Sequence, residues 1–172
     1  MNILFLIGGI SRNSLNRKVF RAMCELAPPD VEVGTFAIEE LPFFSQDLEA
    51  NLPPDVRDLK ATVEAADGII FITPEYNRSI PGVLKNAIDW ASRPYGKNSL
   101  KGKMVGVLGA SPGNIGTFGA QNHLDAVLSY LETMNMGQPE TYLKVNDAFN
   151  EKGELTDPKL RGLLEKFWYA FM

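Results

Sequence analysis

Three segments of the sequence combine glycines with polar side chains whose groups can bind a ligand. They are "GGISRNSLN" (8–16), "TPEYNRS" (73–79) and "GASPGNIGTFG" (109–119). Hydroxyl and amide groups donate hydrogen bonds to phosphate oxygens, and an aromatic ring beside backbone N–H groups suits a planar heterocycle. A packed core does not require this mixture of residues, so we treat the three segments as candidate binding loops.

The first segment joins an apolar run to an amphipathic stretch, as expected where a strand leads into a helix. A helix N-terminus offers unpaired N–H groups and about half a positive charge, and Ser11 and Ser14 add donors without bulk. This suits a phosphate; the alternative is a loop in which Ser14 only caps the helix. The segment lacks the GxGxxG fingerprint of dinucleotide-binding proteins and the GKS or GKT of a P-loop.

The second segment places an acid, a ring, an amide and a cation directly after a buried run. Pro74 fixes the exit from that run, Tyr76 offers a flat ring, and Arg78 places a cation at the mouth of the loop. Ser79 is predicted to cap the helix that follows, with Pro81 in its first turn. We therefore predict that this loop grips a planar heterocycle.

The elements that position these loops alternate between strand and helix. Buried strands are predicted from the continuous apolar runs at 2–7, 68–73 and 103–110, and two further strands from the patterns at 31–36 and 139–145. Helical patterns lie between and after them, which predicts a doubly wound α/β fold with a five-stranded parallel sheet. Ligands bind such sheets at the carboxyl ends of the strands, so the three loops are expected to meet at one edge.

Composition limits the classes of function that remain. The 172 residues are 45% hydrophobic and 22% charged, which predicts a single domain over 1–172. The net charge of −4, with no basic cluster, argues against nucleic acid and anionic membranes as partners. No apolar run approaches ~18 residues, so no membrane span is predicted. A single cysteine excludes an intramolecular disulfide and fits a cytoplasmic location.

The sequence "TPEYNRSIPGVLKNAIDWASRP" (73–94) resembles the signature of the NADPH-dependent FMN reductase family. This flavodoxin-like family includes chromate, quinone and azo-dye reductases. The resemblance extends along the chain: "GGISRNSLN" is similar to the family's phosphate loop, GSLRxxSxN, and "SPGNIGTFGAQNHL" to its third flavin loop, SxGxxGGxRxQxxL. It implies a flavodoxin-like three-layer sandwich with strand order 2-1-3-4-5.

The resemblance also implies roles for the matching residues. The flavin phosphate is assigned to Gly9, Ser11, Arg12, Ser14 and Asn16, and the isoalloxazine to Pro74, Glu75, Tyr76, Asn77, Ser111, Gly113 and Gly116. The chemistry belongs to FMN, so no catalytic side chain and no metal is assigned. The helix at 80–92 is expected to pack against a second copy, in a homodimer or homotetramer.

Two loops depart from the family pattern. Ser11 stands where the family carries arginine, with Arg12 one residue later. Two expectations stay open: weaker neutralisation of the phosphate, or neutralisation by Arg12 from a shifted position. In the third loop, Thr117 replaces a glycine and Gly119 replaces an arginine. Arg78 is a candidate for attracting the 2′-phosphate or pyrophosphate of NADPH, since guanidinium suits phosphate oxygens; the alternative is a solvated surface arginine.

The predicted function is that of an FMN-dependent NAD(P)H oxidoreductase. Hydride would pass from NADPH or NADH to FMN and then to a small acceptor, such as a quinone, a flavin, an azo dye or chromate, in ping-pong fashion. Two alternatives stay open: a flavodoxin that carries electrons to protein partners, and a low-turnover FMN-binding regulatory module.

Overall fold

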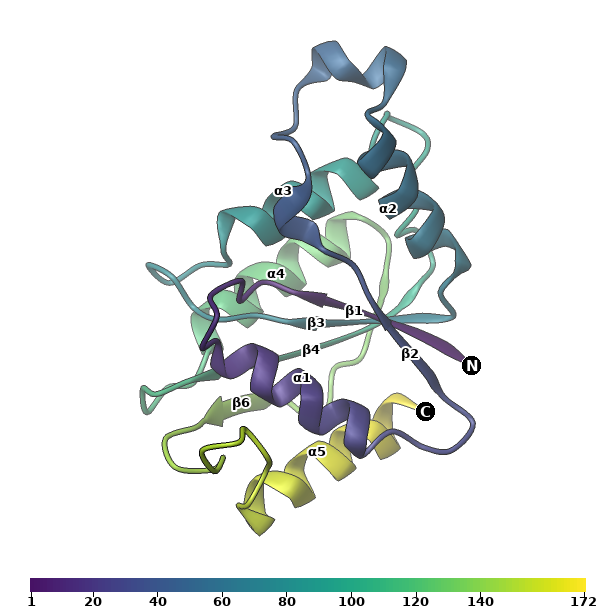
Figure 1. Cartoon of the computed structure of the whole chain (residues 1–172). Helices are drawn as coiled ribbons and strands as arrows, with labels where there is room; N and C mark the ends of the chain where they lie inside the picture. The colour runs from purple at the N-terminus through teal and green to yellow at the C-terminus, as the bar shows by residue number, and fades with distance from the viewer.

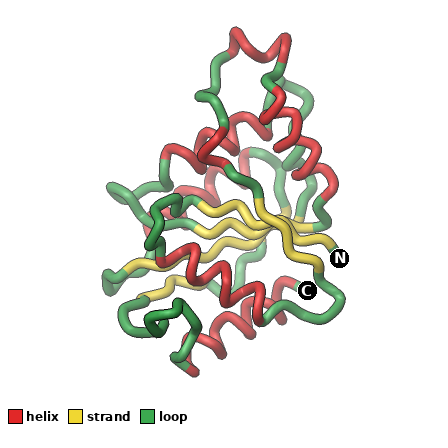
Figure 2. The backbone as a smooth tube through the Cα atoms, viewed as in Figure 1, coloured by secondary structure: helices red, strands yellow, loops and turns green.

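The computed structural model describes all 172 residues and is built around one parallel β-sheet (Figures 1 and 2). The strands run in the order β2-β1-β3-β4-β5, and β6 also pairs with β4. Their bounds are β1 Asn2–Ile7, β2 Glu32–Thr35, β3 Gly68–Ile72, β4 Met104–Ser111, β5 Met134–Asn135 and β6 Thr141–Lys144. The predicted flavodoxin-like order is thus confirmed, with one strand more than expected.

Helices cover both faces of the sheet, which makes three layers (Figure 1). One face carries α1 (Leu15–Glu25) and α5 (Pro158–Phe171), and the other carries α2 (Pro54–Ala65), α3 (Gly82–Ala91) and α4 (Phe118–Tyr130). Alternate residues of a strand enter different cores: Leu4 and Leu6 pack with α2, α3 and α4, whereas Phe5 packs with α1 and α5. Burial on both faces explains why these strands are apolar throughout.

The fifth position of the sheet differs from the prediction. β5 pairs with the beginning of β4, through Met104 and Met134, and β6 pairs with its end, through Leu108 and Thr141. The two strands therefore share the edge that one strand at 139–145 was expected to fill. β5 has only two residues, and so short a segment carries no periodicity by which its sequence could predict it.

The start of α3 also differs from the prediction. The helix begins at Gly82 with Pro81 as its N-cap, so Ser79 does not cap it. The N–H and C=O of Ser79 are instead bonded to the C=O and N–H of Tyr76 across a tight turn. Asp157 caps α5, because its side chain accepts from the N–H of Lys159 before Pro158 opens the helix. No helix combines the length and the apolar character needed to cross a membrane.

Candidate active site

The three loops leave neighbouring strands and meet at the carboxyl edge of the sheet. Loop 1 (residues 8–14) follows β1, loop 2 (residues 73–81) follows β3, and loop 3 (residues 112–117) follows β4. The ladder continues into them, because the N–H of Gly8 bonds to Ile72 O at 2.8 Å and that of Thr73 to Leu108 O at 3.0 Å. The convergence expected from the topology is therefore present.

Loop 1 presents a series of free backbone donors. None of the hydrogen bonds within the chain uses the N–H groups of residues 9–13, and the loop closes on itself only through Ser14 N to Ser11 O at 3.1 Å. These donors lie directly before the N-terminus of α1, where the helix dipole is positive. Together they form a site for an anion.

Ser14 adds a side-chain donor at the same place. It is the N-cap of α1, 7% exposed, and its Oγ accepts from the N–H of Arg17 at 3.4 Å. Its hydroxyl hydrogen has no acceptor within the chain, so capping and ligand binding are compatible. Gly9 lies against this oxygen, and a Cβ at position 9 would collide with Ser14 Oγ. Glycine is therefore required for the backbone to approach the serine so closely.

Asn16 is buried and holds loop 1 to the neighbouring strand. Its Nδ2 donates to Ala110 O at 3.0 Å, and its Oδ1 accepts from Ala110 N at 2.9 Å. The amide thus ties the first turn of α1 to the end of β4, which leads into loop 3. Positioning of two loops is what the structure shows for Asn16, and direct contact with a phosphate stays a prediction.

The two residues at the tip of loop 1 are placed differently from Ser14 and Asn16. Ser11 and Arg12 are both exposed. Arg12 takes part in none of the chain's five ion pairs. Its guanidinium is therefore not fixed near the free N–H groups of the loop.

Loop 2 contains a two-residue turn in the left-handed region. Asn77 and Arg78 have φ of +51° and +65°, and Tyr76 and Ser79 are joined by two backbone hydrogen bonds of 2.9 and 3.0 Å. Pro74 is buried at the exit from β3, whereas Tyr76 is 54% exposed. A non-glycine residue at positive φ costs about 1 kcal/mol, so the turn holds Asn77 and Arg78 in a conformation they would not adopt freely.

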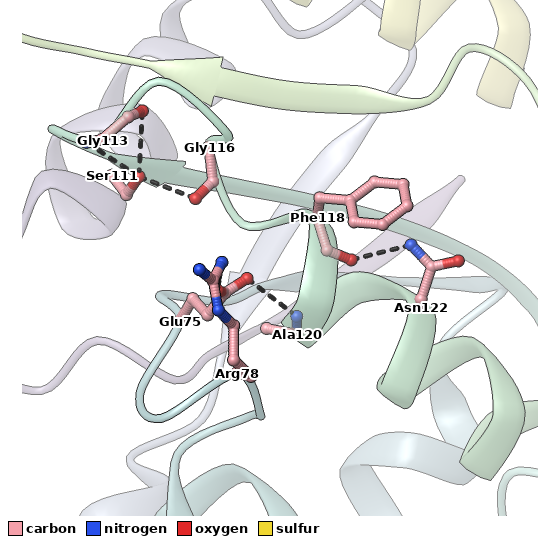
Figure 3. A network of polar contacts seen from close by, with 8 residues as sticks. All are labelled: Glu75, Arg78, Ser111, Gly113, Gly116, Phe118, Ala120 and Asn122. Carbon is pink, nitrogen blue, oxygen red and sulfur yellow. Dashed lines mark hydrogen bonds and ion pairs between the residues drawn. The ribbon is translucent and has the colours of Figure 1, made fainter.

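Glu75 joins loop 2 to α4 (Figure 3). Its Oε2 accepts from the N–H of Ala120 at 3.1 Å, and its Oε1 pairs with Arg78 Nη1 at 3.1 Å. A carboxylate is favourable at this helix N-terminus. Gly119 makes the approach possible, because a Cβ there would lie 3.1 Å from Glu75 Oε2. The arginine of the family pattern is thus replaced by a glycine that accommodates this carboxylate.

Loop 3 is held by Ser111, the last residue of β4, and by β6. Ser111 Oγ donates to Gly116 O at 2.7 Å and accepts from Gly113 N at 3.2 Å (Figure 3). Gly116 has φ of +63°, and a Cβ there would lie 2.9 Å from the carbonyl carbon of Tyr142. This close contact fixes the loop beside the edge of the sheet. Burial raises the pKa of the Tyr142 phenol, and the negative charge of Glu140 raises it further.

Two residues at this edge were not singled out as site residues by their sequence context. His123, on α4, is hydrogen-bonded through Nδ1 to Ser79 Oγ at 2.7 Å, which adds a second tie between loop 2 and α4. Arg17, in the first turn of α1, donates from Nε to Gly9 O at 3.1 Å. Each contact joins residues that are not adjacent in the chain, so neither could be read from local spacing.

These residues fit the phosphate of a flavin mononucleotide. The free N–H groups of residues 9–13, the buried hydroxyl of Ser14 and the N-terminus of α1 supply donors and positive potential in one place. Loop 2, on the adjacent strand β3, and loop 3, on the next strand β4, lie beside this site. A doubly wound sheet of this order with an anion site after β1 defines the flavodoxin-like class of α/β proteins.

Comparison with known proteins identifies the family within that class. The model of the family described as "NADPH-dependent FMN reductase" matches residues 1–146, and the chain belongs to this family. It is thus an NAD(P)H-dependent oxidoreductase of the FMN type.

Individual relatives agree with this assignment. A 2-hydroxy-1,4-benzoquinone reductase from Burkholderia sp is 40% identical over 97% of this chain and 92% of its own length. A quinone reductase from Pseudomonas putida is 40% identical over 96% of this chain and 90% of its own length. The solved structure of FerB, a flavoenzyme NAD(P)H:(acceptor) oxidoreductase from Paracoccus denitrificans, is 42% identical, covers 99% of this chain and 94% of its own, and has a TM-score of 0.94.

Proposed function

We propose that this chain reduces quinone-type acceptors with electrons from NADPH or NADH, and that residues 1–172 form one FMN-binding domain. The observation that carries the proposal is the meeting of three donor-rich loops at the carboxyl edge of β1, β3 and β4. The names of the relatives, two of them quinone reductases, support a quinone as the acceptor.

Each loop has a separate task in this proposal. The N–H groups of residues 9–13 and the Ser14 hydroxyl bind the phosphate. The N–H groups of Glu75, Asn77 and Arg78 have no partner within the chain, so they can donate to the polar edge of the isoalloxazine. Loop 3, braced by Ser111, closes the opposite side. When bound, FMN supplies a ring that can accept hydride from the nicotinamide and pass the electrons on to the acceptor.

A single open face of the ring would be shared by the donor and the acceptor, which predicts ping-pong kinetics. The protein's task is then to hold the ring and to leave that face accessible to planar molecules. Free flavins, azo dyes and chromate are further candidate acceptors of such an open site. In this proposal no side chain acts as nucleophile or general base.

We propose that Arg78 attracts a phosphate of NADPH at the mouth of loop 2. Its side chain is 72% exposed, and only Nη1 is engaged, by Glu75. The remaining guanidinium nitrogens can therefore donate to phosphate oxygens. The turn fixes the backbone of Arg78 at positive φ, which limits the directions that its side chain can take.

Steady-state kinetics test the proposed reaction. Initial rates of NADPH oxidation, measured at several benzoquinone concentrations, should give parallel double-reciprocal lines. Intersecting lines would contradict the ping-pong order, and an absence of NAD(P)H oxidation in the FMN-loaded protein would contradict the enzymatic function. Rapid reduction of the bound flavin by NADPH, without a protein partner, would exclude the electron-carrier alternative.

We also propose a homodimer or homotetramer that uses the helix at 80–92. Most of α3 is buried within its own chain, so the face available to a second copy centres on the Lys85–Asp89 ion pair. This pair lines a polar cavity of about 1130 Å³ that also includes the exposed Tyr95 and Tyr130. Sedimentation velocity should show a dimer or tetramer, and reversal of charge in Lys85→Glu should weaken it; a wild-type monomer would contradict this proposal.

A further inference from the structure

Arg17 contacts loop 1 from the first turn of α1. Its Nε donates to Gly9 O at 3.1 Å, and its Nη2 pairs with Glu39 Oε1 at 2.6 Å. Glu39 belongs to the short 3-10 helix η1 (Ile38–Glu40), which comes after β2. The two contacts hold the guanidinium against the loop and leave Nη1 without a partner within the chain.

The contact with Gly9 orients a peptide group of the anion site. The C=O and N–H of a trans peptide point in opposite directions, so a carbonyl of Gly9 that faces Arg17 turns the N–H of Ile10 to the other side. That N–H is one of the free donors of loop 1. Gly9 also lies against Ser14 Oγ, so this peptide is held beside the serine whose hydroxyl hydrogen is free.

Arg17 carries its positive charge at the end of α1 where a cation is unfavourable. A cation in the first turn of a helix opposes the helix dipole. The first turn of α1 contains no acidic residue, and Glu39 is the only carboxylate paired with Arg17. A phosphate at this end of α1 would be attracted by the dipole and by the guanidinium, and the carboxylate of Glu39 would offset part of the second attraction.

We propose that Arg17 is the positioning residue that makes loop 1 selective for a phosphorylated flavin. This inference rests on the proposed binding of FMN. Arg17 orients the Gly9–Ile10 peptide and supplies fixed positive charge, whereas Arg12 is exposed and unpaired and Ser11 is uncharged. Glu39 holds the guanidinium in place but also repels the phosphate, so it moderates the affinity.

Titration of the full-length apoprotein with FMN and with riboflavin tests this role. The two ligands differ only in the phosphate, and binding is followed by quenching of flavin fluorescence. Because hydrogen bonds to charged groups contribute about 1.5–3 kcal/mol, Arg17→Met should weaken FMN binding about 10- to 100-fold and change riboflavin binding by less than about twofold. Arg17→Lys should recover part of the loss, and Arg21→Gln, one turn further along α1, is the matched control.

Glu39→Gln should change FMN affinity in the opposite direction, so it tests the inference even if the arginine variants fail to fold. Removal of one negative charge near the phosphate should tighten FMN binding about threefold and leave riboflavin binding unchanged. A role that is only structural predicts instead that Arg17→Met and Glu39→Gln weaken both flavins equally.

Three results would overturn the inference. They are equal loss of both flavins in Arg17→Met, no gain of FMN affinity in Glu39→Gln, and a selective loss of FMN in Arg12→Gln without one in Arg17→Met. Equal affinity of the wild-type protein for FMN and riboflavin would reject phosphate selectivity but leave the proposed function intact. Failure to bind either flavin would instead reject the proposed function.

Discussion

Replacement of Asn16 should uncouple loop 1 from β4 and destabilise the fold. The Asn16 amide is buried. It accepts from the N–H of Ala110 at 2.9 Å and donates to the C=O of Ala110 at 3.0 Å. Asn16→Ala leaves one N–H and one C=O unpaired in the interior. Each unsatisfied group costs about 1–3 kcal/mol, and partial access of water lowers the sum, so we expect a loss of about 2–4 kcal/mol in the free energy of unfolding.

Urea denaturation of the apoprotein measures this loss. With a slope of about 2 kcal/mol per molar urea, the middle of the usual range for small proteins, the midpoint should fall by about 1–2 M. Asn16→Asp should be at least as destabilising, because a carboxylate can still accept from Ala110 N but faces Ala110 O with no hydrogen to donate. Asn13→Ala is the matched control: Asn13 lies in the same loop, is exposed, and its side chain makes no hydrogen bond within the chain.

A loss of less than about 1 kcal/mol in Asn16→Ala would contradict this role of Asn16, since a buried amide with two backbone partners should cost more than that to remove. An equal loss in Asn13→Ala would also refute it, because the effect would then belong to the loop in general and not to the tie with β4.

Three further predictions follow from other parts of the edge and from α1. If Arg78 contacts the 2′-phosphate, which NADH lacks, Arg78→Ala should lower kcat/KM for NADPH about fivefold and leave that for NADH unchanged, as expected for an exposed charge; equal losses for both nucleotides would indicate the shared pyrophosphate instead, and no loss for either would reject the role. Gly116→Ala should cost about 2–4 kcal/mol, because position 116 has φ of +63° and its Cβ would press on the backbone of β6. Gly137→Ala, with no atom near its Cβ, should change stability by less than about 0.5 kcal/mol, and equal effects would contradict the steric reasoning. Cys24 is exposed, but partial burial of its thiol raises the pKa of that thiol, and the negative charge of Glu25 raises it further, so at neutral pH iodoacetamide should alkylate it more slowly in the folded protein than in urea. Glu25→Gln should lower that pKa and speed alkylation. Faster alkylation of the folded wild type than of the protein in urea would contradict a raised pKa of the thiol.

Much of the fold could be predicted from the sequence because the central strands are buried on both faces. The continuous apolar runs that form β1, β3 and β4 are typical of such strands. The loops after them could then be placed at one edge of the sheet by topology alone. β5 could not be predicted, since its two residues pair only because the chain passes the start of β4. The start of α3 could not be predicted either, because Ser79 is held by the turn that begins at Tyr76.

The candidate site was predictable in its location but not in its internal contacts. The residue types in loop 1 indicated an anion site, and the free N–H groups agree with it. That Asn16 is held by Ala110, and Gly9 by Arg17, depends on distances between segments that only the folded chain brings together. The position of Glu75 at the N-terminus of α4 is of the same kind, because it requires Gly119, 44 residues further along the chain.

The visible spectrum of the purified full-length protein, before and after anaerobic addition of NADPH, shows whether the chain binds FMN and reduces it. We expect a yellow protein, or one that becomes yellow and quenches flavin fluorescence when FMN is added, with a band at ~450 nm that bleaches with NADPH. A protein that takes up no FMN, or one whose bound FMN stays oxidised in the presence of both NADPH and NADH, would contradict it.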